Sequence, residues 1–240
     1  MRQTLLACAL SIVCAVPAQA QSQNAFGIPT KQVTNPSASI DAAPGSRAQG
    51  WRSQGRSEVL ARHGMVATSD PLAAQAGLEI LQAGGNAIDA AVAVASTLNV
   101  AEPYMSGVGG IGIALVYIAK EGRTRVLNFS GHAPNAAQPE MYDHLNAETG
   151  PISPLVPGNV SGWMTMHDTY GSLPLSRVMR DAIQYADKGI ALTPFNAAMV
   201  DENLVRIDQF ETSQKAMVIE RSGLSAGSVL RLPQLAESGQ

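Results

Sequence analysis

Apolar residues recur at helical spacing in the first well-patterned stretch of the chain. Over residues 72–83 they alternate with good helix formers, and Asp70 followed by Pro71 offers an N-cap with proline at the first helical position. Gly84 and Gly85 predict the end of this helix, because glycine readily adopts the left-handed conformation that closes a helix.

A second helix is predicted to follow at once. Asn86 can cap it, and Asp89 stands three residues later in the capping-box position. The stretch up to Leu98 is rich in Ala and Val, whose small side chains allow close packing, so we expect a buried helix.

Three runs predict strands. Residues 64–68 are apolar and suit a short buried strand, whereas residues 111–118 and 123–129 are rich in β-formers. Gly122 lies between the last two runs and suits a short turn, which predicts an antiparallel hairpin.

The second half of the chain is predicted to be mostly helical. Residues 135–160 read as loop with one helical turn at 139–142, and helices are expected over 158–170, over 175–188 with Gly189 as the stop, and from Thr193 toward Leu204. Helix pairs alternating with a hairpin predict an α+β fold in layers rather than a doubly wound parallel sheet.

The N-terminus predicts export. Residues 1–20 combine a positive start, an apolar core too short to span a bilayer and a small-residue cleavage site ending at Ala20. Residues 21–57 are polar and predict a flexible leader, which leaves residues 58–240 as the folded region. We therefore expect a periplasmic or secreted bacterial protein that is not held in the membrane once the signal is removed. Both cysteines, Cys8 and Cys14, would be removed with it.

Composition excludes several partners. The chain has 240 residues, 45% of them hydrophobic, and a formal charge of −3, which describes a globular protein without a basic stripe for nucleic acid. The four histidines show no metal-binding spacing, so no metal site is predicted.

Residues 107–112 satisfy the G-x-G-x-x-G pattern of dinucleotide-binding loops. That loop needs a strand before it and a helix after it, so that the helix N-terminus faces the pyrophosphate. Here a predicted helix precedes the glycines and a predicted strand follows them. We expect instead that the glycines allow another strand or an acyl substrate to approach the backbone.

Seven sequence blocks in the same order resemble the γ-glutamyltranspeptidase family, and the likeness runs from about His63 to Ala236. The blocks are Gly64-Met65-Val66-Ala67-Thr68 with Pro71-Leu72-Ala73; Gly84-Gly85-Asn86-x-x-Asp89-Ala90-Ala91; Glu102-Pro103 with Ser106-Gly107-x-Gly109-Gly110; Ala133-Pro134; Val156-Pro157-Gly158-x-Val160-x-Gly162; Tyr170-Gly171-x-Leu173-Pro174; and Ala226-Gly227-x-x-Leu230-x-x-Pro233-x-Leu235-Ala236.

This resemblance implies an N-terminal nucleophile hydrolase-like αββα sandwich, of which the chain would hold only the large-subunit portion. In that family, autocleavage exposes the N-terminal Thr of a small subunit, which attacks a γ-glutamyl amide such as glutathione without a metal or organic cofactor. No Thr here stands in the expected Thr-Thr-His-like motif, so no catalytic residue is assigned. A small catalytic subunit from downstream sequence is the expected partner.

Substrate specificity is expected to depend on Ser130, Gly131 and His132. Typical members resembling this chain carry Arg-Glu-x-Ala-Pro, whose Arg holds the substrate α-carboxylate, whereas this chain has Ser-Gly-His before Ala133-Pro134. The pattern is closer to the Ser-Gly-Arg-Ala-Pro of the acylase-like branch, with His132 in the Arg position. The alternative, that these residues merely end a strand, remains open.

Three functions follow as hypotheses. The chain contributes to transfer or hydrolysis of γ-glutamyl amides, or to an acylase-like amidase with a substrate other than glutathione, or it is an inactive remnant or binding subunit.

Overall fold

The computed structural model describes residues 60–143, 147–216, 218–219 and 225–239, and the predicted signal peptide and leader lie outside them. The elements, in chain order, are α1 (Pro71–Gln82), α2 (Ala87–Ala101), β1 (Gly112–Ile118), β2 (Arg123–Phe129), η1 (Pro139–Met141), α3 (Asn159–Tyr170), α4 (Leu175–Val178), α5 (Arg180–Lys188), β3 (Ile190–Ala191), α6 (Pro194–Ile207), α7 (Glu211–Ala216), β4 (Val218–Ile219), β5 (Val229–Arg231) and α8 (Pro233–Ser238).

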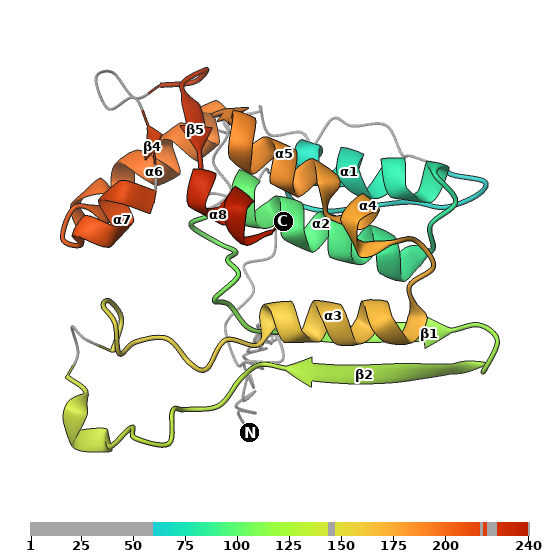
Figure 1. Cartoon of the computed structure of the whole chain (residues 1–240), viewed down its shortest axis with the longest axis horizontal. Helices are drawn as coiled ribbons and strands as arrows, with labels where there is room; N and C mark the ends of the chain where they lie inside the picture. The colour runs from blue at the N-terminus through green and yellow to red at the C-terminus, as the bar shows by residue number, and fades with distance from the viewer. Residues whose placement is uncertain (1–59, 144–146, 217, 220–224, 240) are drawn as a thin grey trace, which may run out of the picture.

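Helices α1, α2 and α5 form a layer, and the β1–β2 hairpin lies on the far side of α3 from it (Figure 1). Helix α2 packs against α1, α3 and α5, and α3 in turn contacts β2. This arrangement of helices and an antiparallel hairpin confirms the predicted α+β class. Among the described residues, no helix has both the length and the apolar character that crossing a membrane requires.

Both sheets are antiparallel. Strands β1 and β2 pair in a register that sets Gly112 opposite Phe129 and Ile118 opposite Arg123, as the predicted hairpin requires. A second sheet has the order β3-β5-β4, and its short strands come from residues 190–231. The sequence pattern did not predict this sheet, because strands of two or three residues leave no measurable alternation.

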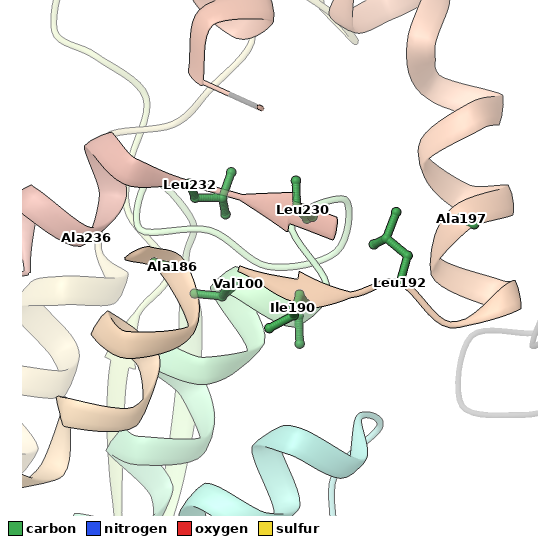
Figure 2. Packing of buried hydrophobic residues seen from close by; sticks show 9 residues of the cluster. Val100, Ala186, Ile190, Leu192, Ala197, Leu230, Leu232 and Ala236 are labelled. Atoms are coloured by element: carbon green, nitrogen blue, oxygen red, sulfur yellow. The ribbon is translucent and has the colours of Figure 1, made fainter. Parts of the chain in front are cut away.

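Two apolar clusters form the core. One joins α2, α5, α6 and α8 to the second sheet through Val100, Ile190, Leu192 and Leu230, as Figure 2 shows. The other packs Trp163 and Met166 of α3 between α2 and the inward side chains of the β1–β2 hairpin. Because α2 contributes to both clusters, it is the central buried element, as its Ala- and Val-rich sequence predicted.

The predicted helix ends agree with the structure. Asp70 accepts a hydrogen bond from the Leu72 N–H at 2.8 Å, and Asn86 and Asp89 form a complete capping box at the start of α2. Gly84 has a φ of +89°, in the left-handed region that glycine was predicted to supply.

Two predictions were wrong. Residues 64–68 form no strand, and Met65 is 56% exposed; no strand lies beside this segment within the described residues to complete a ladder, and Val66 packs on α1 instead. Residues 175–188 are two helices, α4 and α5, which meet at Met179.

One face of the β1–β2 hairpin has no cover among the described residues. Alternate side chains of β1 point away from α3, and Leu115 and Tyr117 are 73% and 66% exposed. Val126 of β2, which is paired with Leu115, extends the same apolar face.

Candidate functional site

The end of β2 is held against α3 by close packing around Phe129. A Cβ atom on Gly112 would lie 2.5 Å from the Phe129 ring, and one on Gly162 of α3 would overlap that ring. A Cβ on Gly158 would overlap the Phe129 carbonyl oxygen. Only glycine at these three positions lets the strand end and the start of α3 approach this closely. The packing therefore brings residues 130–132 to the N-terminal end of α3.

Ser130, Gly131 and His132 leave the strand in a defined turn. Asn128 Oδ1 accepts hydrogen bonds from the Ser130 N–H at 2.9 Å and from the Ser130 hydroxyl at 2.6 Å. Gly131 has a φ of +73°, and a Cβ there would overlap the Val156 carbonyl oxygen. The His132 carbonyl oxygen accepts from the Val156 N–H at 3.0 Å, so the segment is joined to the loop before α3.

These three predicted residues lie together on one pocket of about 390 Å³. Its other walls come from residues 127–129 at the end of β2, from residues 156–158, and from Ser161, Gly162 and Thr165 on the first turns of α3. Among the described residues, His132 is the one ionisable side chain that lines this pocket, and no described Arg or Lys lines it. These residues can therefore supply hydroxyl groups and an imidazole to a ligand, but no guanidinium for a bidentate contact with a carboxylate.

The loop of residues 106–110 is bonded to the same end of α3. The Gly110 carbonyl oxygen accepts from the N–H groups of Gly158 and Asn159 at 3.0 Å each, and the Asn159 side-chain amide donates to the Gly107 carbonyl oxygen at 2.8 Å. A Cβ on Gly110 would lie 2.6 Å from Asn159 Nδ2. The first turn of α3 is thus the close neighbour of Gly107 and Gly110, whereas Gly112 lies against Phe129 of β2, which is the strand neighbour that we gave as one of two alternatives. Helix α2 before the loop and β1 after it also confirm that the dinucleotide-binding context is absent.

The sequence did not reveal that Asp89 connects two distant blocks. Its carboxylate accepts from the Ser172 N–H at 3.0 Å and from the Ser172 hydroxyl at 2.5 Å, in addition to the Asn86 N–H at 2.9 Å. The Asn86 side chain donates to the Tyr170 carbonyl oxygen at 2.6 Å. The Gly-Gly-Asn-x-x-Asp and Tyr-Gly-x-Leu-Pro blocks therefore join the start of α2 to the end of α3, which is a structural role.

His167 extends this network. Its Nε2 lies 2.8 Å from the Leu173 carbonyl oxygen, to which it donates, and 3.8 Å from Asp89 Oδ1. Burial raises the pKa of the Asp89 carboxyl, but hydrogen bonds from Ser172, Asn86 and Leu173 outweigh that effect, so its pKa lies below the ordinary value. Asp89 consequently stays ionised and bonded at neutral pH.

Four of the described threonines lie in helices or at a helix cap. Thr165 and Thr169 donate their hydroxyls to backbone carbonyl oxygens of α3, Thr193 caps α6, and Thr97 is buried in α2. Each has its nitrogen in a peptide bond, whereas an N-terminal threonine nucleophile uses its free amine as the base. Within the described ranges, no three His, Cys, Asp or Glu side chains gather as metal ligands.

Comparisons with known proteins place the chain among the α+β structures of gamma-glutamyltranspeptidases and acylases. A solved structure of γ-glutamyltranspeptidase from Helicobacter pylori superposes with a TM-score of 0.71 at 30% identity, covering 76% of this chain and 54% of that one. The family model for gamma-glutamyltranspeptidase matches residues 73–239. The chain belongs to the γ-glutamyltranspeptidase family.

Curated relatives include acylase and glutathione hydrolase proenzymes. An acylase ACY 1 proenzyme of Pseudomonas sp. strain SE83 is 40% identical over 58% of this chain and 27% of its own length. A glutathione hydrolase proenzyme of Bacillus subtilis strain 168 is 36% identical over 60% of this chain and 26% of its own length. The chain thus spans about a quarter of the length of these two relatives.

Proposed function

We propose that this chain forms part of an exported γ-glutamyltranspeptidase-like amidase or acyltransferase and supplies one wall of its acyl-binding pocket. The observation that carries the proposal is the pocket at the end of β2, where Ser130, Gly131 and His132 occupy the positions at which the family resemblance places substrate recognition. The glycines around Phe129 hold those residues against α3, so the wall has a defined geometry.

The attacking hydroxyl, in this proposal, belongs to a segment other than residues 60–239. None of the described threonines has the free α-amine that the reaction needs, and Thr165 and Thr169 already donate their hydroxyls to the backbone. A Thr-bearing small subunit would attack the amide carbonyl and form an acyl-enzyme, and water or an amine would then take the acyl group. The exposed apolar face of the hairpin is where a further layer of the family's sandwich would pack.

An acylase-like substrate is the second candidate, and the lining of the pocket favours it. A free γ-glutamyl group carries an α-carboxylate, for which a bidentate Arg is the strong partner, and no Arg of the described part of the chain lines this pocket. A single imidazole at His132 makes a weaker and pH-dependent contact with an anion. Acyl groups without an α-carboxylate should therefore compete well with γ-glutamyl groups.

Reconstitution tests the activity. The purified chain is mixed with the separately purified small subunit of the Pseudomonas acylase relative, and release of p-nitroaniline from γ-glutamyl-p-nitroanilide is followed. We expect no release by the chain alone and release by the pair. Turnover by the chain alone would refute the proposed location of the nucleophile, and failure of the pair to associate or react would favour an inactive remnant.

The same assay tests specificity. Butyryl-p-nitroanilide lacks the α-carboxylate and α-amine, so the ratio of kcat/KM for the two anilides measures what the pocket recognises. In the variant His132→Arg the ratio should shift toward the γ-glutamyl substrate by about tenfold, the size of one charge-assisted contact. An unchanged ratio would show that residue 132 does not face the acyl group.

Export is tested independently. We expect cell fractionation of the source bacterium to recover the protein outside the cytoplasm, with Edman sequencing starting at Gln21. A cytoplasmic protein retaining Met1 would contradict this part of the proposal.

A further inference from the structure

We propose that a pocket between α6, α7 and the loop of residues 147–153 binds a short peptide that has apolar side chains and two free, charged termini. This α6 pocket has a volume of about 560 Å³, within the usual range for small-molecule sites. It shares no lining residue with the pocket of Ser130–His132, so the proposal goes beyond the proposed function and does not depend on it.

One wall of the α6 pocket is a single face of α6. The helix residues that line it recur at intervals of three and four positions, which places them along one side of the helix. They are Met199, Val200, Asn203, Arg206 and Ile207. Val200 is 2% exposed, so the pocket extends inward to a buried apolar side chain.

The facing wall is held in place by the turn at Gly150. The Ser153 N–H and hydroxyl both donate to the Gly150 carbonyl oxygen, at 3.3 Å and 2.9 Å. Gly150 has a φ of +117°, and a Cβ there would lie 3.8 Å from the ring of Phe210, which precedes α7. The loop therefore packs on Phe210, and Figure 1 shows it extending toward α7.

Two charges of opposite sign stand on opposite walls of the α6 pocket. Arg206 lies on α6 and Glu148 lies on the loop; both are exposed, and neither forms an ion pair within the described ranges. Their charged atoms are accordingly more than 4.0 Å apart. The described lining residues include no other Asp, Glu, Lys, Arg or His, so the formal charge of the pocket is zero.

This arrangement matches a ligand that is also zwitterionic and has its two charges apart. A carboxylate is the preferred partner of a guanidinium, and an ammonium group is a partner for a carboxylate. The two termini of a dipeptide lie on either side of its peptide bond, whereas both charges of a single amino acid are attached to one carbon. A dipeptide therefore spans separated partners better and fills more of the 560 Å³.

The interior of the pocket determines the side chains that the peptide should carry. Val200, Ile207 and Phe210 offer apolar surface between the two charged residues. Burying apolar side chains against that surface supplies most of the affinity, because contacts between exposed charges contribute modestly. The charges then distinguish a peptide with free termini from one whose termini are blocked.

Isothermal titration calorimetry on the purified chain tests this with three ligands that share their two side chains. They are leucyl-phenylalanine, its N-acetyl derivative, which lacks the ammonium charge, and its C-terminal amide, which lacks the carboxylate charge. We expect a Kd on the order of 100 µM for the free dipeptide. Each blocked form should bind about fivefold more weakly, the size of one exposed charge contact.

Variants assign each charge to its partner. Arg206→Gln should make the free dipeptide and its amide bind equally while keeping the preference over the N-acetyl form, and Glu148→Gln should do the reverse. Arg231→Gln and Glu140→Gln are the matched controls, since both residues are exposed and lie outside the lining; they should behave as the unmutated chain. All four substitutions are at exposed positions, where the cost to folding is small.

The assay measures binding without turnover, so an inactive chain can still give the expected result. Equal binding of the three ligands to the unmutated chain, or no binding of the free dipeptide, would overturn the proposal. Preferences that survive in both Arg206→Gln and Glu148→Gln would overturn it as well, because the peptide would then bind elsewhere.

Discussion

At the scale of single residues, Gly131 is a position where backbone conformation and space both require glycine. Its φ of +73° lies in the left-handed region, and a Cβ would overlap the Val156 carbonyl oxygen. The turn that carries Ser130 and His132 therefore has a fixed backbone conformation.

The variant Gly131→Ala should lower the free energy of unfolding by about 2–4 kcal/mol, since it adds a steric overlap to the cost of a positive φ. Gly122→Ala is the matched control: Gly122 has a φ of +62°, but nothing lies within 4 Å of its added Cβ, so about 1 kcal/mol is expected. Urea denaturation measures both. Equal losses would mean that residues 130–132 can move away from Val156 freely.

The lowered pKa of Asp89 predicts that the free energy of unfolding depends on pH in the acid range. Because its pKa is lower in the folded chain than in the unfolded chain, its contribution is complete above about pH 4, the unfolded value, and is lost as the pH falls through the folded value. Asp89→Asn should cost about 2–4 kcal/mol at pH 7, because donors from Ser172 and Asn86 lose a charged acceptor.

Urea denaturation between pH 7 and pH 2.5 gives the measurement. The loss caused by Asp89→Asn should shrink as the pH falls below 4. Asp168→Asn is the control, since that carboxylate is 80% exposed and lies 3.8 Å from His167 without a hydrogen bond of its own in the described structure. A pH-independent loss for Asp89→Asn would contradict the assigned shift in pKa.

At the scale of elements, the contact between β2 and α3 depends on the small size of Gly162. The Phe129 ring occupies the space where a Cβ of residue 162 would lie, so the helix and the strand end approach as closely as the backbone allows. The pocket of Ser130–His132 includes both elements, and its shape follows from that distance.

Gly162→Ala should therefore cost about 1–3 kcal/mol through overpacking, despite the better helix propensity of alanine. Phe129→Leu removes the ring and should lessen the cost of Gly162→Ala in the double variant. A double-mutant cycle of thermal unfolding measures the coupling. Additive effects would show that the ring moves aside without cost.

At the scale of the whole molecule, the exposed apolar face of the β1–β2 hairpin is the surface through which we expect the chain to associate with other chains. Leu115, Tyr117 and Val126 expose apolar surface side by side on a two-stranded sheet. A two-stranded sheet that is open at both edges and apolar on one face associates readily with other chains.

The isolated chain should accordingly self-associate in a concentration-dependent way. The double variant Leu115→Lys, Val126→Lys adds charge to this face and should shift the chain toward monomer in sedimentation velocity, while leaving the melting temperature nearly unchanged. Ser161→Lys on α3, which is exposed but lies away from that face, is the control. Equal association of all three proteins would place the contact elsewhere.

Local signals explain how much of the fold the sequence predicted. Asp70, Asn86 and Gly84 act through hydrogen bonds and backbone conformations within a few residues, so the ends of α1 and α2 were readable from the chain alone. The hairpin was readable for the same reason. The segment of residues 64–68 has the composition of a strand, but pairing needs a neighbour, which no local pattern can supply.

The sequence by itself determined the helix caps, the hairpin, the α+β class and the family resemblance, because each depends on spacing along the chain. Only the tertiary structure decided that the glycine loop packs on Asn159, that Asp89 joins α2 to the end of α3, and that Phe129 lies among three glycines. Those contacts join residues that are about 50 to 80 positions apart or come from different elements. The packing of α3 between α2 and the hairpin determines which residues make these contacts. No periodicity in the sequence predicts that packing.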